Sequence, residues 1–389
     1  MALLRFLKRV LLTVIVVAIV VFVVGIGWVL THRDDARAWR QVSTIAAGLV
    51  DLGGTSEAAG EWLAVDTTAA REVAAGTLPA TLVRPDDDDA ADPAIVLLVP
   101  EGTTGAEEQR VREAQHAIAG AGLSAWAVRV PGGADALVDA AGYEALAGSL
   151  AAIASHDTTE DERVSVVAAG PIASLVLVAA ASDDLREQIR AVVAVQPIAD
   201  VRGIVSLATT GSYVRADGRA VRVELSPELR ESAGRAVFQA IRADLPDGGP
   251  VLEPLLDAAE ASDDPLAALE LVPPDVAGPE LRPLLDVARA ETPAEFDAAW
   301  DRLPSSFRDA AGERSPLPFA GQVQARVLAV QASEEAWAQE DVARLADALP
   351  DARTLELDPE DPGSVVDDPA AVRDLLSVSG WWMRRAGSS

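Results

Sequence analysis

The sequence predicts an α/β domain, in which helices cover both faces of a mainly parallel sheet, preceded by one transmembrane helix. Two patterns carry this prediction. From residue 77 onward, short apolar runs alternate with segments of helical length, which is typical of strands buried on both faces of a parallel sheet. Near the start of the chain, a long segment without charge is typical of a membrane span.

Composition supports a large, acidic, folded domain. The chain has 389 residues, of which 50% are hydrophobic, so a sizeable core is expected. Its formal net charge of −29 repels the phosphates of nucleic acid, and no nucleic-acid partner is expected. The absence of cysteine excludes disulfides, thiolate nucleophiles and zinc–thiolate sites.

The N-terminal segment is predicted to be a retained membrane anchor. Residues 10–30 carry no charge, and as a helix they would span about 31 Å, close to the thickness of the bilayer core. A cleaved signal peptide is the alternative, but its apolar region is shorter than this one. We therefore expect residues 1–33 to form a tail and anchor that contacts the lipid bilayer through residues 10–30.

Basic residues on the two sides of this span bear on its orientation. Arg5, Lys8 and Arg9 precede it, and Arg33, Arg37 and Arg40 follow it. Because basic residues favour the cytoplasmic side, the first group predicts a cytoplasmic N-terminus, although the two sides are nearly balanced. The expected location is the cell membrane, with the large domain on the extracytoplasmic side.

The remainder is expected to contain a helical connector, residues 34–65, and one large domain, residues 66–389. Strands are expected at residues 77–84, 94–99, 125–130, 164–169, 191–195, 325–330 and 353–357. Helices are expected at residues 107–121, 134–154, 171–181, 341–349 and 369–385. Repeated proline breaks predict a helical insertion at about residues 200–318.

The order of these segments resembles the α/β-hydrolase superfamily, in particular dienelactone-hydrolase-like serine hydrolases. The segments that carry the resemblance are LPATLVRP (78–85), AIVLLVPEG (94–102), ERVSVVAAG (162–170) and ARVLAVQASEE (325–335). The resemblance implies an α/β-hydrolase-like sheet. It also implies a nucleophile on the turn after strand 164–169, an acid after strand 325–330, and a histidine after strand 353–357.

At the nucleophile position this sequence departs from the G-x-S-x-G pattern. The position equivalent to the serine is Gly170, and Pro171 follows it. The residue after the nucleophile normally gives its backbone N–H to the oxyanion hole, and proline has no N–H to give. Ser174 lies one helical turn further on, and Ser165 lies within the preceding strand, so a shift of register does not supply the nucleophile.

Of the other two members of a catalytic triad, the acid has a matching residue in this sequence and the histidine has none. Glu335, beside Glu334, matches the position of the acid. No histidine occurs in residues 357–389, where the resemblance implies one. The three histidines of the chain, His32, His116 and His156, lie elsewhere, and surface or capping roles are expected for the last two.

Acidic residues offer a weaker, alternative site. Loops expected at one edge of the sheet carry candidate oxygen ligands for a hard cation such as calcium or magnesium. These are Glu101, Glu334, Glu335, Asp358 and Glu360. No cofactor is expected, because the chain contains neither a dinucleotide-binding fingerprint nor a P-loop.

These observations favour a non-catalytic protein of α/β-hydrolase-like fold that binds an unknown protein or small-molecule ligand. Two alternatives stay open at this point. One is an active envelope esterase or lactonase that uses residues outside the matched positions. The other is a scaffold that binds divalent cations.

Overall fold

The structure is a computed structural model that describes the domain from residue 71 onward, with gaps. The described residues are 71–76, 78–85, 91–131, 140–215, 218–224, 230, 262, 265–270, 282–331 and 336–356. The predicted span at residues 10–30, the connector at 34–65 and the last predicted helix at 369–385 lie outside them. Within the described part, no helix is both long and apolar enough to cross a bilayer.

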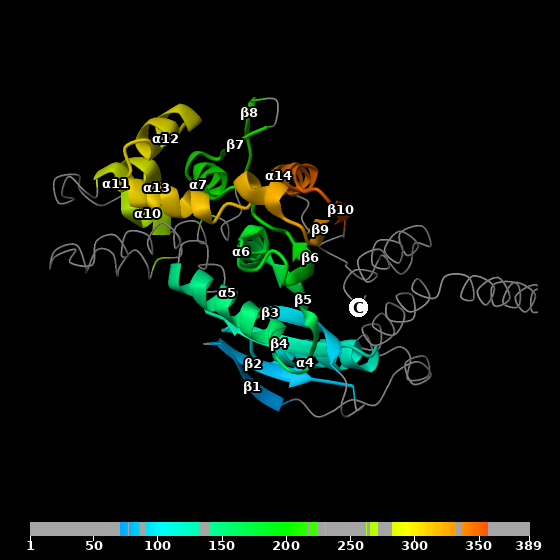
Figure 1. The fold of residues 1–389 in the computed structure, drawn as a ribbon. Coiled ribbons are helices and arrows are strands. Elements are labelled where there is room, and N and C mark those ends of the chain that lie inside the picture. The colour runs from blue at the N-terminus through cyan, green and yellow to red at the C-terminus, as the bar shows by residue number, and fades with distance from the viewer. Residues whose placement is uncertain are drawn as a thin grey trace, which may run out of the picture.

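An eight-stranded sheet organises the domain (Figure 1). Its strands are numbered in chain order and lie side by side in the order β1-β2-β4-β3-β5-β6-β9-β10. They are β1 (Arg71–Ala75), β2 (Leu78–Val83), β3 (Asp92–Pro100), β4 (Ser124–Val130), β5 (Thr159–Ala169), β6 (Ile189–Val195), β9 (Arg326–Gln331) and β10 (Ala352–Glu356).

The sheet is mainly parallel, as the sequence predicts. The six strands from β4 to β10 pair in parallel, whereas β2 runs antiparallel to both β1 and β4. The segments on which the resemblance rests form β2, β3, β5 and β9, in the expected order. The predicted α/β-hydrolase-like fold, a mainly parallel sheet flanked by helices, is therefore confirmed.

Helices cover both faces of this sheet (Figure 1). They are α4 (Ala106–Gly120), α5 (Ala140–Ala154), α6 (Gly170–Ala181) and α14 (Ala336–Ala348). Successive side chains of a strand point to opposite faces. Val96 packs in the cluster that includes residues of α5, α6 and α14, and Ile95 packs in the cluster that includes Ile118 of α4. The alternation places α4 opposite the other three helices.

A second group of helices lies between β6 and β9 in the chain and has its own apolar core. The group comprises α7 (Val201–Thr210), α10 (Pro265–Glu270), α11 (Arg282–Ala288), α12 (Pro293–Trp300) and α13 (Ser305–Glu313). Phe296, Trp300 and Phe307 stack in its centre, with ring centroids 5.4 and 5.5 Å apart in the two successive pairs. In Figure 1 these helices gather beyond the edge of the sheet that lies next to α6. A short 3-10 helix, η2 (Leu317–Gln322), leads back to β9.

Two features were absent from the sequence-based prediction. The segment predicted to be helical contains a hairpin, β7 (Ser212–Val214) and β8 (Ala220–Arg222), whose strands pair antiparallel. β1 was also missed, because its sequence REVAA is only five residues long and begins with two charged residues. Gly76, at φ +60°, provides the left-handed backbone that turns β1 into β2.

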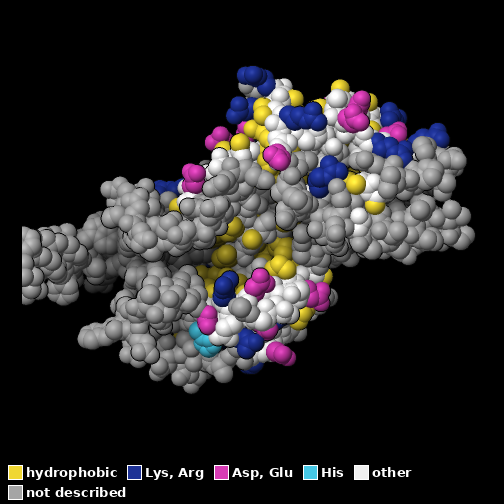
Figure 2. Space-filling view, turned by 180° about the vertical axis from the view of Figure 1, so that it is seen from behind, with side chains coloured by type: hydrophobic (Ala, Val, Ile, Leu, Met, Phe, Trp, Pro, Cys, Tyr) yellow, Lys and Arg dark blue, Asp and Glu magenta, His cyan; other side chains and the backbone are white. Residues whose placement is uncertain are grey.

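The described surface mixes charges of both signs. Figure 2 shows arginine and acidic side chains interspersed at the top and bottom of one face, with apolar side chains gathered between them. Interspersed charges allow local ion pairs, of which Arg129–Glu108 at 2.9 Å and Arg202–Asp297 at 2.7 Å are examples. The net negative charge of the chain therefore coexists with many neutralised pairs.

Candidate functional site

The turn between β5 and α6 is a sharp strand-to-helix elbow. β5 ends at Ala169, α6 begins at Gly170, and Gly170 has a left-handed φ of 55°. Glycine adopts this conformation without the steric cost that a side chain brings. Pro171 stands in the first turn of α6, where its fixed φ suits the helix and its missing N–H breaks no helical hydrogen bond. The elbow has the geometry that presents a nucleophile in a hydrolase, but it carries no side chain.

The hydroxyl of Ser174 has a structural function one turn into α6. Its residue is fully buried, at 0% exposure. The Oγ atom accepts a hydrogen bond from the backbone N–H of Ile198 at 2.8 Å and donates to the Gly170 carbonyl at 3.4 Å. The first contact ties α6 to the loop after β6, and the second lies within α6, so Ser174 positions backbone and is closed to substrate.

Ser165 lies within β5, between Ile95 of β3 and Ala191 of β6. It is 1% exposed, so its hydroxyl is also inaccessible. Neither serine considered as a substitute nucleophile can therefore reach a ligand without a rearrangement of the core.

The two described histidines lie away from the elbow. His156 precedes β5, and its Nδ1 accepts from the backbone N–H of Thr158 at 3.2 Å. Its ring also packs edge-on against Trp126, with centroids 5.0 Å apart. β5 separates that end from the elbow, and its residues 164 to 169 alone span about 20 Å. His116 is exposed on α4.

Only one of the five candidate cation ligands falls in the described part of the chain. Glu101 follows β3 and is exposed. Glu334 and Glu335, the second of which is the predicted acid, lie outside the described residues, as do Asp358 and Glu360. Among the described residues, no group of three or more acidic or histidine side chains is arranged to hold a metal ion.

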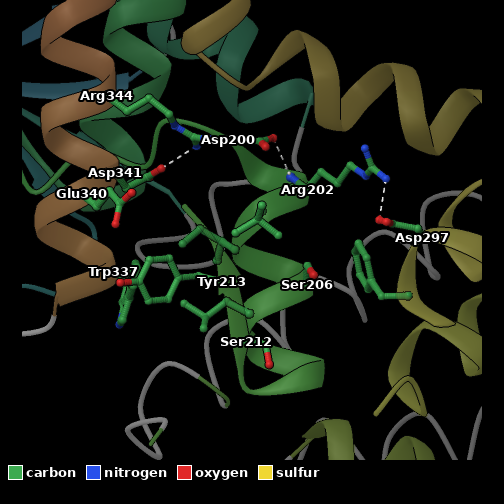
Figure 3. Close-up of a pocket in the computed structure, with 15 residues that line it drawn as sticks. Asp200, Arg202, Ser206, Ser212, Tyr213, Asp297, Trp337, Glu340, Asp341 and Arg344 are labelled. Carbon is green, nitrogen blue, oxygen red and sulfur yellow. Dashed lines mark hydrogen bonds and ion pairs between the residues drawn. The ribbon is translucent and has the colours of Figure 1, made fainter. Parts of the chain in front are cut away.

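A cavity of about 310 Å³ opens beside the loop after β6. We call it the α7–α14 cavity, because α14 supplies one wall and α7 with β7 supplies the other (Figure 3). The residues that matter for its chemistry are Asp200, Arg202, Tyr213, Asp297, Trp337, Glu340, Asp341 and Arg344. Such a position, beyond the carboxyl ends of parallel strands, is where open α/β sheets bind ligands.

Asp341 is the most deeply placed carboxylate of this cavity. Only 13% of its side chain is exposed. Burial raises the pKa of Asp341 above its ordinary value, while the hydrogen bond from the Ala199 N–H, at 2.7 Å, and the guanidinium of Arg344, also at 2.7 Å, act to lower that pKa. Its main structural effect is to fix the loop that ends in Asp200.

The cavity was not predicted from the sequence. Its residues come from four elements, α7, β7, α12 and α14, which extend from residue 200 to residue 344, and none belongs to a recognisable motif. Among the cavity residues, Asp200 has the clearest signal in the sequence, because an aspartate just before a helical segment is a typical N-cap. The structure shows that role, since its Oδ1 accepts from the Arg202 N–H at 3.1 Å.

Comparison with known proteins gives similarity of fold at low identity. No family model matches the chain, and no curated protein matches it. A thermostable esterase from Pseudomonas putida is 11% identical, with a TM-score of 0.45, over 90% of this chain and 92% of the esterase. Est1E from Butyrivibrio proteoclasticus is 12% identical, with a TM-score of 0.42, over 83% of this chain and 100% of Est1E.

A dipeptidyl peptidase 4 from Porphyromonas gingivalis is also similar, at 12% identity and a TM-score of 0.43. The match covers 82% of this chain but 35% of the peptidase, so the chain spans about a third of that protein's length. The class that the sheet and its elbow define is an α/β protein with an α/β-hydrolase-like arrangement.

Proposed function

We propose that this chain is a non-catalytic, membrane-anchored protein of α/β-hydrolase-like fold that binds a ligand or partner. The observation that carries the proposal is the elbow itself. Gly170 and Pro171 occupy the two positions that would supply the nucleophile and one oxyanion donor. The two losses are adjacent and chemically independent, so one residue at a neighbouring position does not replace both.

Two further observations support the same proposal. The hydroxyl nearest to the elbow along α6, that of Ser174, is buried and bonded to backbone. No histidine follows His156 in the sequence, so the region that normally carries the general base lacks one. A serine mechanism needs nucleophile and base within hydrogen-bond reach of each other.

The α7–α14 cavity supports a binding role. It lies at the edge of the sheet where ligands are expected, and it combines aromatic and charged side chains. Its volume suits a small ligand. The membrane anchor, if present as proposed, would hold this binding domain at the cell envelope.

Hydrolysis of a panel of short-chain aryl esters by the full-length chain tests the proposal. We expect the same rate as for a Ser174→Ala variant, and no faster than for a heat-denatured sample. A Gly170→Ser variant should also stay inactive, because it gains a hydroxyl but neither a histidine nor the missing N–H.

The rival outcome is turnover that one serine substitution abolishes while the fold is retained. That result would make the protein an active hydrolase that uses residues outside the matched positions. It would overturn the proposal directly.

A further inference from the structure

We propose that the α7–α14 cavity binds a small organic cation with an aromatic or apolar portion. The inference rests on the proposed binding function and adds the chemical class of the ligand. It follows from how the charges of the cavity are already paired, from its aromatic walls, and from the field of the whole chain.

The arginines at the cavity are already neutralised. Arg344 pairs with Asp341 at 2.7 Å, and Arg202 pairs with Asp297 at 2.7 Å. Arg215, next to the cavity on the hairpin, pairs with Glu340 at 3.1 Å. An anionic ligand would have to displace these carboxylates before it could use an arginine, so the site disfavours anions.

Asp200 is the acidic group left over from these pairs. Within the described part of the chain, its carboxylate is engaged by the backbone N–H of Arg202 and forms no ion pair. A cap bond of this kind occupies one oxygen and leaves the negative charge in place. With Arg215 counted, three arginines are paired with three of the four lining acids, so one negative charge is left, and a cation would neutralise it.

Aromatic rings supply the second part of the site. Trp337 lies on α14, and Tyr213 extends from β7 toward that helix (Figure 3). The faces of tryptophan and tyrosine attract ammonium groups, and this attraction strengthens where water is excluded. On the wall that α7 forms with β7, Ile204 and Leu207 add apolar surface for the uncharged portion of the ligand.

The charge of the whole chain acts in the same direction. A formal net charge of −29 raises the local concentration of cations and lowers that of anions near the surface. The charges that line the cavity and the net charge of the whole chain thus favour the same class of ligand, a cation.

The test is calorimetric binding of three matched aromatic probes to the full-length chain at fixed salt. The probes are benzyltrimethylammonium, benzyl alcohol and benzoate, which differ mainly in charge. We expect the cation to bind about tenfold more tightly than the alcohol, and benzoate to bind more weakly than either. Equal or tighter binding of benzoate or the alcohol, or no binding of any probe at millimolar concentration, would overturn the proposal.

An Asp200→Asn variant locates the site. Asparagine is as good an N-cap as aspartate, so the variant removes the charge and keeps the start of α7. Cation affinity should fall by about fivefold, whereas the alcohol should bind unchanged. Asp309→Asn, an exposed position on α13 outside the cavity, is the matched control for loss of one negative charge. An equal loss in both variants would show that only the general field acts, and the site would be rejected.

Tyr213→Leu provides a second variant, because it removes a π face and keeps an apolar side chain. Its cation affinity should fall by about threefold or more. Ester turnover in the separate hydrolysis assay would overturn the proposed non-catalytic function, but it would leave the result on cation binding unaffected. Absent turnover together with absent cation binding would reject only the cavity assignment.

Discussion

Residue 170 has a left-handed backbone and open space around it, so a substitution there tests backbone strain alone. A Cβ atom built on Gly170 meets no atom within 4 Å. Gly170→Ala should therefore lower the free energy of unfolding by about 1 kcal/mol, which is the cost of a side chain at this φ. Urea denaturation of the full-length chain measures the difference.

The control for this prediction is the same substitution in an ordinary helix. Gly148 lies within α5, is exposed, and also has open space at its Cβ position. Gly148→Ala should stabilise the chain by up to about 1 kcal/mol, because alanine favours helix. Effects of the same sign at both positions would contradict the left-handed geometry of the elbow.

Ser174 holds the loop after β6 through one buried hydrogen bond. Ser174→Ala leaves the Ile198 N–H without its acceptor inside the protein, and we expect a loss of about 1–3 kcal/mol in the free energy of unfolding. Ser149→Ala is the matched control, since Ser149 is also fully buried on a helix but only donates to the Ala145 carbonyl. The loss in free energy of unfolding should be clearly smaller for Ser149→Ala, and the urea denaturation midpoints of the two variants measure the difference. A Ser174→Ala variant as stable as the control would contradict this role.

At the scale of elements, the loop between β6 and α7 is fixed from three directions. Two of its backbone N–H groups donate to Ser174 of α6 and to Asp341 of α14, at 2.8 and 2.7 Å. At its end, the N–H of the first residue of α7 donates to Ser315 after α13, at 3.0 Å. The loop thus connects the sheet, the helices that cover it and the inserted helices. This arrangement explains why buried polar side chains are kept at three positions distant in the chain.

Asp341 makes the stability of this junction depend on pH. Because burial raises its pKa above the ordinary value of 3.8, the folded state holds this proton more tightly than the unfolded state. Its contribution to stability is therefore full below that value and is lost as the pH rises through the raised pKa. The free energy of unfolding of Asp341→Asn, relative to the unmodified chain, should rise over the same window.

Thermal denaturation across that pH range checks this prediction. Asparagine keeps an oxygen for the Ala199 N–H, so the junction should persist in the variant. Asp347→Asn, at an exposed position of the same helix, controls for the loss of one charge. A pH-dependent difference no larger than that of the control would contradict the burial of Asp341.

The sequence predicted the elements of the sheet well because their signals are local. Residues 191–195 are a continuous apolar run and residues 164–169 are apolar apart from Ser165, and these segments lie within β6 and β5. α14 begins at Ala336, five residues before its predicted start, because the first turn carries Trp337 and Ala338 without a capping signal. The hairpin β7–β8 was not predicted, because its three-residue strands show no clear alternation of apolar and polar side chains.

The elbow could be located from the sequence, but the cavity could not. Gly170 and Pro171 stand directly after an apolar run, so their place at a strand-to-helix turn follows from adjacent residues. The cavity instead depends on how α7, α12 and α14 pack together, which brings Arg202 within 2.7 Å of Asp297. No periodicity in a single sequence specifies such packing between distant segments.

At the scale of the whole molecule, we propose that an anchor at residues 10–30 would hold the domain at the membrane. The full-length chain should remain with the membrane fraction after a high-salt wash, since burial of residues 10–30 does not depend on charge. Deletion of residues 1–33 should release the domain into the supernatant. A series of Leu-to-Ala substitutions within the span, which leaves the net charge unchanged, is the control. Retention of the deleted form on membranes would contradict the anchor.

We propose that this α/β-hydrolase-like molecule has no catalytic serine. The most direct measurement is the intact mass of the full-length chain after treatment with a fluorophosphonate probe, followed by mapping of any adduct. We expect an unchanged mass, because the elbow carries Gly170 and the hydroxyl of Ser174 is buried. A stoichiometric adduct on one serine, prevented by substituting that serine, would contradict it and identify the protein as an active hydrolase.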